Sequence, residues 1–204
     1  MITIIDYGVG NLFSLCSSFR YIGEEVRVTS DRREIENADR LVLPGVGAFA
    51  DARRKLAEHG LDEVILREAE KGKPLFGICL GMQMLLDRSY EYGVHEGLGL
   101  IPGEVRPISE VIPAGYKIPH IGWNALSFGE SRHPLFSSLC EGDHVYFVHS
   151  YYGADCAESV IATAEYGAPL TAAVARDNVM GTQFHPEKSG EVGLRILKEF
   201  ARFG

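Results

Sequence analysis

The sequence contains few cysteines, fewer basic than acidic residues and no long apolar run. Its four cysteines lie far apart without a Cys-x-x-Cys pair, which argues against a disulfide framework and favours reduced thiols in the cytoplasm. The 20 basic residues are scattered along a chain with 28 acidic ones, which disfavours a nucleic-acid or anionic-membrane partner. No apolar stretch is long enough to cross a bilayer. The first residues lack basic charge and soon reach Asp6, which indicates a strand and not a signal peptide.

Metal-ligand patterns are missing as well. The seven histidines form no His-Glu-x-x-His motif and no Cys/His ligand spacing, so we expect neither a metal nor another cofactor. Cys16 lies on the apolar side of an expected helix, while Cys140 and Cys156 lie in expected turns without basic neighbours. We expect Cys16 to pack as a small apolar side chain, and Cys140 and Cys156 to be unreactive.

The first half of the chain alternates β-rich runs with helical ones. Its composition, 46% apolar and 24% charged over 204 residues, is typical of one globular domain. We expect strands at 2–5, 26–29, 40–43 and 74–78, and helices at 11–22, 51–71 and 80–87. Apolar strands separated by helices predict an α/β fold, with a mostly parallel sheet covered on both faces and functional loops at the carboxyl ends of its strands. The loops after Asp6, after Pro44 and at Cys79 should therefore lie together.

The second half is richer in β signals. We expect strands at 145–148, 159–164, 170–176 and 179–184, followed by a final helix at 191–203. Consecutive strands suggest an antiparallel extension of the central sheet. The stretch 90–122, with several prolines and glycines, is the least regular part of the chain.

Cys79 stands at the centre of the most informative segment, Gly77-Ile78-Cys79-Leu80-Gly81. The segment indicates a buried strand that turns sharply into a helix, and the Gly-x-Cys-x-Gly spacing lets a nucleophile occupy such a strained turn. The first free N–H groups of the helix would favour thiolate over thiol. We therefore expect Cys79 to be an activated nucleophile.

The segment His185-Pro186-Glu187 is the best candidate for the base that this nucleophile needs. Pro186 disfavours a helical conformation at His185, so we expect an extended tripeptide. Residues two apart then point the same way, which lets Glu187 orient one nitrogen of His185 while the other faces the thiol. Alone, such a pair would more often be exposed and solvated; beside the cysteine turn, we favour the catalytic interpretation.

A second glycine-rich loop, residues 44–49, follows the expected strand 40–43. Its backbone N–H groups at Val46 and Gly47, together with that of Leu80, could form an oxyanion hole. A plain strand-to-helix turn explains the loop equally well.

Three motifs together resemble the class I glutamine amidotransferases: PGVGAF at 44–49, GICLGMQ at 77–83 and QFHPEKSG at 183–190. The resemblance runs over residues 1–204 and implies a single-domain, three-layer, flavodoxin-like fold. It implies Cys79 as nucleophile, His185 as acid and base, and Glu187 as its orienting partner. It also assigns the binding of glutamine to further positions, which are Gly47, Gln83, His149, Ser150 and Tyr151.

Further motifs narrow the resemblance within that family: DYGVGN at 6–11, PHIGWN at 119–124 and YFVHSYY at 146–152, with a methionine at position 82. They resemble glutaminase subunits that deliver ammonia to a (β/α)8-barrel cyclase in histidine biosynthesis. The resemblance implies a heterodimer, with glutamine hydrolysed through a Cys79 thioester and the ammonia channelled to the partner.

The expected partner interface comprises Asn11, Trp123, Tyr146 and Lys188, although a core aromatic is an equally good interpretation of Trp123. Three other interpretations of the chain also stay open. It could serve an anthranilate-type synthase, act as a catalytically silent regulatory subunit, or be a cysteine hydrolase of related fold.

Overall fold

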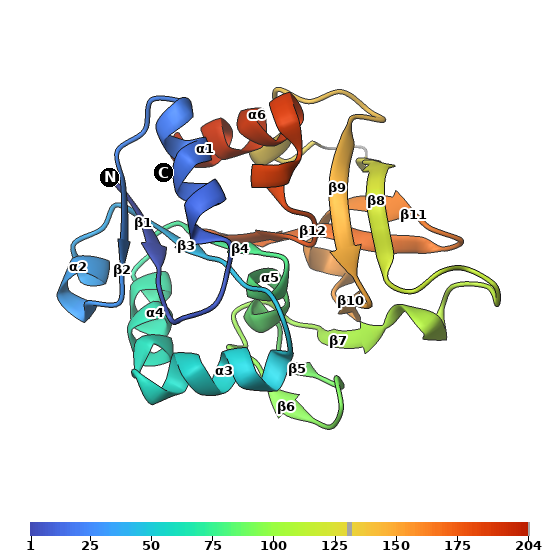
Figure 1. Ribbon diagram of the computed structural model, residues 1–204, viewed down its shortest axis with the longest axis horizontal. Coiled ribbons are helices and arrows are strands. Elements are labelled where there is room, and N and C mark those ends of the chain that lie inside the picture. Colours follow the sequence, from blue (N-terminus) through green and yellow to red (C-terminus); the bar gives the residue numbers. More distant parts are fainter. Residues whose placement is uncertain (130–131, 204) are drawn as a thin grey trace.

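The computed structural model describes residues 1–129 and 132–203, and over these residues the central sheet has seven strands (Figure 1). From one edge to the other, the strands are β11 Val160–Glu165, β12 Pro169–Arg176, β13 Val179–Thr182, β4 Leu75–Ile78, β3 Arg40–Leu43, β1 Ile2–Ile5 and β2 Val26–Thr29. The five strands from β13 to β2 are parallel, whereas β11 and β12 pair antiparallel. The predicted parallel sheet with an antiparallel extension is confirmed.

Helices cover both faces of this sheet (Figure 1). They are α1 Leu12–Tyr21, α2 Arg32–Glu36, α3 Phe49–Glu58, α4 Leu61–Glu70, α5 Leu80–Leu85 and α6 Gly190–Ala201. Phe19 of α1 and Phe200 of α6 belong to one buried apolar cluster. Leu56 of α3 and Ile65 of α4 belong to a second cluster on the other face. The molecule is therefore a three-layer α/β structure, as predicted.

Two small sheets stand beside the central one. One has the order β10-β7-β5-β6, and the other pairs β8 with β9. Their strands are β5 Arg88–Ser89, β6 His95–Glu96, β7 Glu104–Pro107, β8 His120–Ala125, β9 His144–His149 and β10 Tyr151–Ala154. Short 3-10 turns occur at η1 Ile108–Glu110, η2 Pro134–Phe136, η3 Ala157–Ser159 and η4 Pro186–Lys188. None of the helices in the described part of the chain is long and apolar enough to cross a membrane.

Several sequence predictions of local structure are confirmed and others are wrong. Strands 2–5, 26–29 and 40–43 begin and end as predicted. The single helix predicted at 51–71 is wrong, because Gly60 adopts a left-handed conformation, with φ 59°, between α3 and α4. Helix α2 was not predicted; it begins where the Asp31 carboxylate accepts hydrogen bonds from the N–H groups of Arg33 and Glu34.

The strand predicted at 145–148 exists, but its place in the central sheet is wrong. As β9 it pairs with β8 along six residues, from His120 with His149 to Ala125 with His144. Its buried residues alternate with less buried ones, so only one of its faces packs on the core. A strand with that pattern fits a separate two-stranded layer better than a sheet that is covered on both faces.

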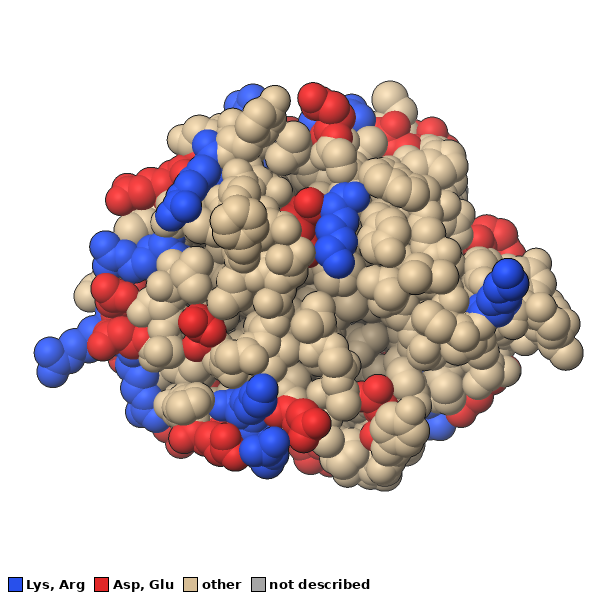
Figure 2. All heavy atoms as spheres, viewed as in Figure 1, with Lys and Arg blue, Asp and Glu red and all other residues tan. Residues whose placement is uncertain are grey.

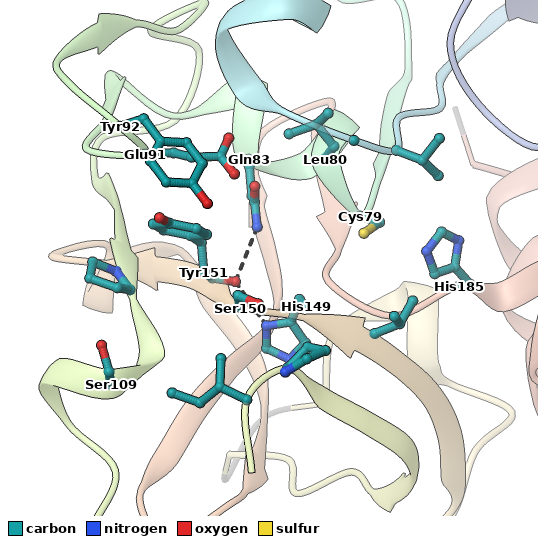
Figure 3. A pocket seen from close by; sticks show the side chains of 16 residues that line it. Cys79, Leu80, Gln83, Glu91, Tyr92, Ser109, His149, Ser150, Tyr151 and His185 are labelled. Carbon is teal, nitrogen blue, oxygen red and sulfur yellow. Dashed lines mark hydrogen bonds between the residues drawn. The ribbon is translucent and has the colours of Figure 1, made fainter.

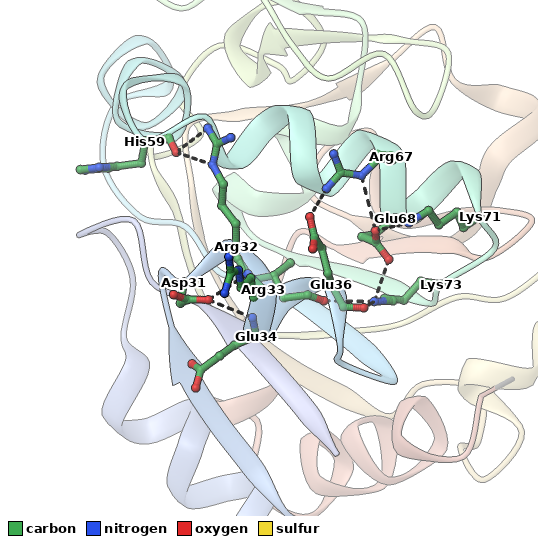
Figure 4. Close-up of polar contacts among 11 residues, drawn as sticks. Asp31, Arg32, Arg33, Glu34, Glu36, His59, Arg67, Glu68, Lys71 and Lys73 are labelled. Carbon is green, nitrogen blue, oxygen red and sulfur yellow. Dashed lines mark hydrogen bonds and ion pairs between the residues drawn. The ribbon is translucent and has the colours of Figure 1, made fainter.

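An ion cluster around the buried Glu68 stabilises the end of the sheet away from Cys79, and Figure 4 shows its side chains. The Glu68 carboxylate accepts hydrogen bonds from Lys71 Nζ at 2.7 Å and from Lys73 Nζ at 2.8 Å. Lys73 Nζ also donates to the carbonyls of Ile35 and Glu36, at 3.0 and 2.7 Å, at the end of α2. Burial raises the pKa of Glu68, but the two lysines outweigh it and hold the pKa below its usual value.

We expect Glu68→Ala to lower the free energy of unfolding by about 3 kcal/mol, because it leaves the nearly buried Lys73 without its carboxylate. Chemical denaturation measures this loss. The exposed pair Arg54 and Glu58 supplies a control, since Glu58→Ala should cost less than about 1 kcal/mol. A lowered folded pKa means that the contribution of Glu68 is present above its ordinary pKa and disappears as the pH falls through the folded value. Equal losses in the two variants would contradict the expectation.

Candidate active site

The loops that follow three parallel strands meet at one edge of the sheet, as predicted. Tyr7, just after β1, donates a hydrogen bond of 2.6 Å from its hydroxyl to the carbonyl of Pro44, just after β3. Gly81, just after β4, packs against the end of β3, where an added Cβ would lie 1.9 Å from Leu43 O. Carboxyl ends of parallel strands are where α/β folds place their sites.

Cys79 occupies a strained turn between β4 and α5. Its φ of 54° and ψ of −109° are unusual for a residue with a side chain. The flanking glycines allow this close packing, because a Cβ at Gly77 would lie 2.8 Å from the carbonyl oxygen of Gly81. The sharp turn that the Gly-x-Cys-x-Gly spacing predicts is therefore present, and it brings the thiol to the wall of a cavity.

His185 and Glu187 form a buried pair. His185 Nδ1 lies 2.8 Å from Glu187 Oε1, and the two side chains are 2% and 3% exposed. The predicted extended tripeptide is wrong beyond His185, since residues Pro186–Lys188 form the turn η4. Proline fits the first position of a helical turn because its φ is already fixed there. The turn still brings the carboxylate to the imidazole.

The second nitrogen of His185 is directed to the cavity. Nε2 makes no hydrogen bond to another described residue, and Figure 3 shows the ring beside the sulfur of Cys79. Burial lowers the pKa of His185, but the interactions with Cys79 and with Glu187 outweigh it and raise the pKa to about 9. The site therefore favours the protonated imidazolium form of His185 beside Cys79.

A cavity of about 560 Å³ joins these groups to most of the remaining candidate residues. Its predicted lining residues are Val46, Gly47, Cys79, Leu80, Gln83, His149, Ser150, Tyr151 and His185. Others line it without having been predicted: Glu91, Tyr92, Pro107, Ser109, Ile118, Pro119 and Val148. Among the side chains labelled in Figure 3, His149 comes from β9, Tyr151 comes from β10, and Cys79 comes from the turn before α5.

The candidate oxyanion donors meet at this cavity. Gly47 adopts φ 92°, which a larger residue would rarely adopt. The N–H groups of Gly47 and Leu80 donate to no other described residue. Both groups are thus free to bind an anionic oxygen, while the role itself stays a prediction.

Gln183 is a buried residue of the site that sequence reasoning missed. Its Nε2 lies 3.7 Å from Cys79 Sγ, and its Oε1 accepts a hydrogen bond of 3.0 Å from Gln83 Nε2. A signal was available, since Gln183 stands two residues before His185 in the same motif.

Glu91 was also missed. Its carboxylate lines the cavity and accepts a hydrogen bond from the backbone N–H of Phe49, the first residue of α3. Among the described residues that line the cavity, it is the one with a carboxylate. The irregular stretch 90–122 gave no sequence pattern that could single it out.

Three of the four predicted interface residues lie together. Trp123 is 56% exposed, which rules out the core interpretation, and its ring centroid lies 6.2 Å from that of Tyr146. Lys188 Nζ lies 5.9 Å from the Tyr146 ring centroid. Asn11 instead caps α1, where its side chain accepts a hydrogen bond from Ser14 N.

The face in Figure 2 has acidic and basic side chains interspersed around a largely uncharged centre, without a patch of one sign.

Comparison with known proteins identifies the family. The model of the family "Glutamine amidotransferase class-I" matches residues 3–202. The chain belongs to the class I glutamine amidotransferases, which confirms the resemblance, and it is an enzyme of that family.

The names of individual relatives are more specific than the name of the family. The imidazole glycerol phosphate synthase subunit HisH of Syntrophotalea carbinolica is 52% identical over 204 residues, with 98% of each chain covered. The same subunit of Wolinella succinogenes is 45% identical over 206 residues, with 100% of each covered. Among solved structures, a glutamine amidotransferase crystal structure gives a TM-score of 0.77 at 19% identity, covering 100% of this chain and 98% of that one. That likeness bears on the fold alone.

Proposed function

We propose that this chain is the glutaminase subunit of an imidazole glycerol phosphate synthase. It hydrolyses glutamine to glutamate and ammonia and supplies the ammonia to a cyclase subunit that makes imidazole glycerol phosphate in histidine biosynthesis. The observation that carries the proposal is the cavity in which the strained Cys79 thiol lies beside the buried pair of His185 and Glu187. Near-full-length relatives that bear this subunit's name support the choice of pathway.

In the proposed reaction, the Cys79 thiolate attacks the side-chain amide carbon of glutamine. The backbone N–H groups of Leu80 and of Val46 or Gly47 stabilise the oxyanion. His185 protonates the departing nitrogen, and ammonia leaves a thioester on Cys79. His185 then takes a proton from water, which hydrolyses the thioester to glutamate.

Glu91 fits the α-amino group of glutamine, because it brings a negative charge to the cavity. Ser150 and Tyr151 line the same cavity and fit the α-carboxylate group, which is attached to the same carbon atom as the α-amino group. We expect Glu91→Gln to raise the KM for glutamine about tenfold or more, since the ammonium group loses its charged partner. Ser109→Ala, at another lining position, supplies the control. An unchanged KM in Glu91→Gln would remove Glu91 from the binding site.

The pH dependence follows from the raised pKa of His185. We expect kcat/KM for glutamine to fall on the alkaline side near pH 9, because His185 must carry the proton that the leaving nitrogen takes. The stability that the charged pair of His185 and Glu187 contributes is fully present below the ordinary histidine pKa. It is lost as the pH rises through the folded pKa of His185, about 9. Glu187 helps to raise the pKa, so Glu187→Gln should move the alkaline limb to lower pH. If the alkaline fall in kcat/KM occurred at the same pH in Glu187→Gln, His185 would not be the group that causes it.

The proposed partner is a separate cyclase chain of (β/α)8-barrel fold, bound as a heterodimer in the cytoplasm. Free ammonia is mostly protonated in neutral water and then cannot attack an electrophile, which favours direct delivery. The exposed Trp123 beside Tyr146 and Lys188 is the surface that we assign to this partner, with Asn11 as a further candidate.

Ammonia release from glutamine tests the proposal when measured with the chain alone, with the cyclase, and with the cyclase and its nucleotide ligand. We expect a low rate alone and a high rate with partner and ligand. A high rate without any partner would contradict the coupling. Activation and co-purification only with an anthranilate-type synthase chain would overturn the choice of partner.

A further inference from the structure

A chain of hydrogen bonds runs behind the cavity wall, from Asn124 to the backbone carbonyl of Tyr151. Asn124 Nδ2 lies 3.3 Å from His120 Nε2. His120 Nδ1 lies 2.9 Å from His149 Nε2, and His149 Nδ1 lies 2.8 Å from Tyr151 O. Both imidazoles are buried, but of the two only His149 lines the cavity.

The two ends of this chain fix the direction of every hydrogen bond in it. A carbonyl oxygen can only accept, so His149 donates from Nδ1 to Tyr151. At the other end, Asn124 Nδ2 also donates to the carbonyl of Glu165 at 2.8 Å, which identifies it as the amide nitrogen. It therefore donates to His120 Nε2, and His120 Nδ1 is left as the donor to His149. Both rings are thus neutral and protonated at Nδ1.

The surroundings keep the first ring neutral and in place. Burial lowers the pKa of His120 to about 4. Its ring is stacked between Phe147, at a centroid distance of 4.8 Å, and Tyr166, at 4.1 Å. Burial also lowers the pKa of His149 to about 4, although its hydrogen bond to the Tyr151 carbonyl acts in the opposite direction. Neither ring carries charge at neutral pH.

The Tyr151 carbonyl connects this chain to the nucleophile. Gln83 Nε2 donates to the same carbonyl at 3.1 Å and to Gln183 Oε1 at 3.0 Å. Gln183 Nε2 in turn lies 3.7 Å from Cys79 Sγ. A continuous set of polar contacts therefore leads from Asn124 on β8 to the sulfur. Figure 3 shows the central part of it, where Gln83 and His149 approach Tyr151.

We propose that His120 and Asn124 are positioning residues for the glutamine site. They hold His149 as its neutral Nδ1–H tautomer, so that His149 donates to Tyr151 and fixes the main chain at 149–151, where glutamine is expected to bind. Neither residue lines the cavity, so both act through His149. The inference deepens the proposed function and rests on it for the identity of the ligand.

The tautomers can be measured directly by long-range ¹H–¹⁵N correlation NMR of the full chain at neutral pH. We expect both His120 and His149 to show a protonated Nδ1 and an unprotonated Nε2. An Nε2–H form of either ring, or a doubly protonated ring, would overturn the proposal. This measurement needs no glutamine, so its result is independent of the proposed function.

Substitutions test whether the chain positions the glutamine site. His120→Phe keeps a stacking ring but loses the donor, and we expect glutamine to bind the full chain about tenfold more weakly, because a buried acceptor is left unpaired. His120→Asn places an amide donor where Nδ1 was, and should restore most of the affinity. Ile121→Ala, at an exposed position next to His120 on the same strand, should leave binding unchanged. Calorimetric titration with glutamine measures each affinity.

Two results would contradict the positioning role. One is an unchanged affinity in His120→Phe, and the other is a loss in His120→Asn as large as that in His120→Phe. If His120→Phe does not fold, the tautomers of His120 and His149 in the unsubstituted chain still test the proposal. Failure of the unsubstituted chain to bind glutamine would instead count against the proposed function.

Discussion

Cys79→Ala is expected to abolish glutamine hydrolysis, even with the cyclase and its nucleotide ligand present. The thiol is the one group at the strained turn that can attack the amide carbon, and it lines the same cavity as His185. Removing a nucleophile of this kind lowers kcat by about 10⁴-fold or more. Steady-state ammonia release measures the loss.

The matched control for this substitution is Cys140→Ala, which removes an exposed thiol from the same chain. It should retain the rate of the unsubstituted enzyme. Turnover in Cys79→Ala within about tenfold of the unsubstituted rate would contradict the mechanism, because a covalent route through this sulfur would then be unnecessary.

Gly81→Ala is expected to damage both activity and stability. A Cβ at this position would lie 1.9 Å from the carbonyl oxygen of Leu43, a contact that backbone atoms can relieve only by moving apart. We expect the free energy of unfolding to fall by about 3 kcal/mol. Because the Cys79 turn must also shift, kcat/KM should fall about 100-fold or more.

Gly129→Ala is the control for this second substitution. Apart from its chain neighbours, no described residue has an atom within 4 Å of the Cβ that would be added at Gly129, and the residue is exposed. Thermal unfolding and ammonia release should both stay near the values of the unsubstituted chain. If Gly81→Ala behaved like Gly129→Ala, close packing at the cysteine turn would not be what holds the nucleophile.

Short-range patterns were sufficient to predict the sheet and the turn that holds Cys79. The strand at 40–43 has three apolar residues in a row between Arg40 and Pro44, and the strands at 2–5 and 26–29 have β-branched residues at most positions. The glycines at 77 and 81 predicted close packing because only glycine tolerates it. The cysteine turn was thus visible from a few neighbouring residues.

Contacts between distant segments could not be predicted in the same way. The approach of Gln183 to Cys79 joins residues 104 positions apart, and Glu91 reaches the cavity from the irregular stretch 90–122. His120 likewise approaches the cavity only through its contact with His149, which is 29 positions away in the sequence. The break at Gly60 was missed because a single glycine is tolerated within many helical patterns.

The central claim is that glutamine forms a thioester with Cys79, and the most direct test is to trap that intermediate. The enzyme, with cyclase and nucleotide ligand, would be mixed with isotopically labelled glutamine, quenched in acid during turnover, and digested for mass spectrometry. The proposed reaction predicts a labelled γ-glutamyl group on the peptide that contains Cys79 and none in Cys79→Ala. Label on a different residue, or rapid hydrolysis without any trapped thioester, would contradict it.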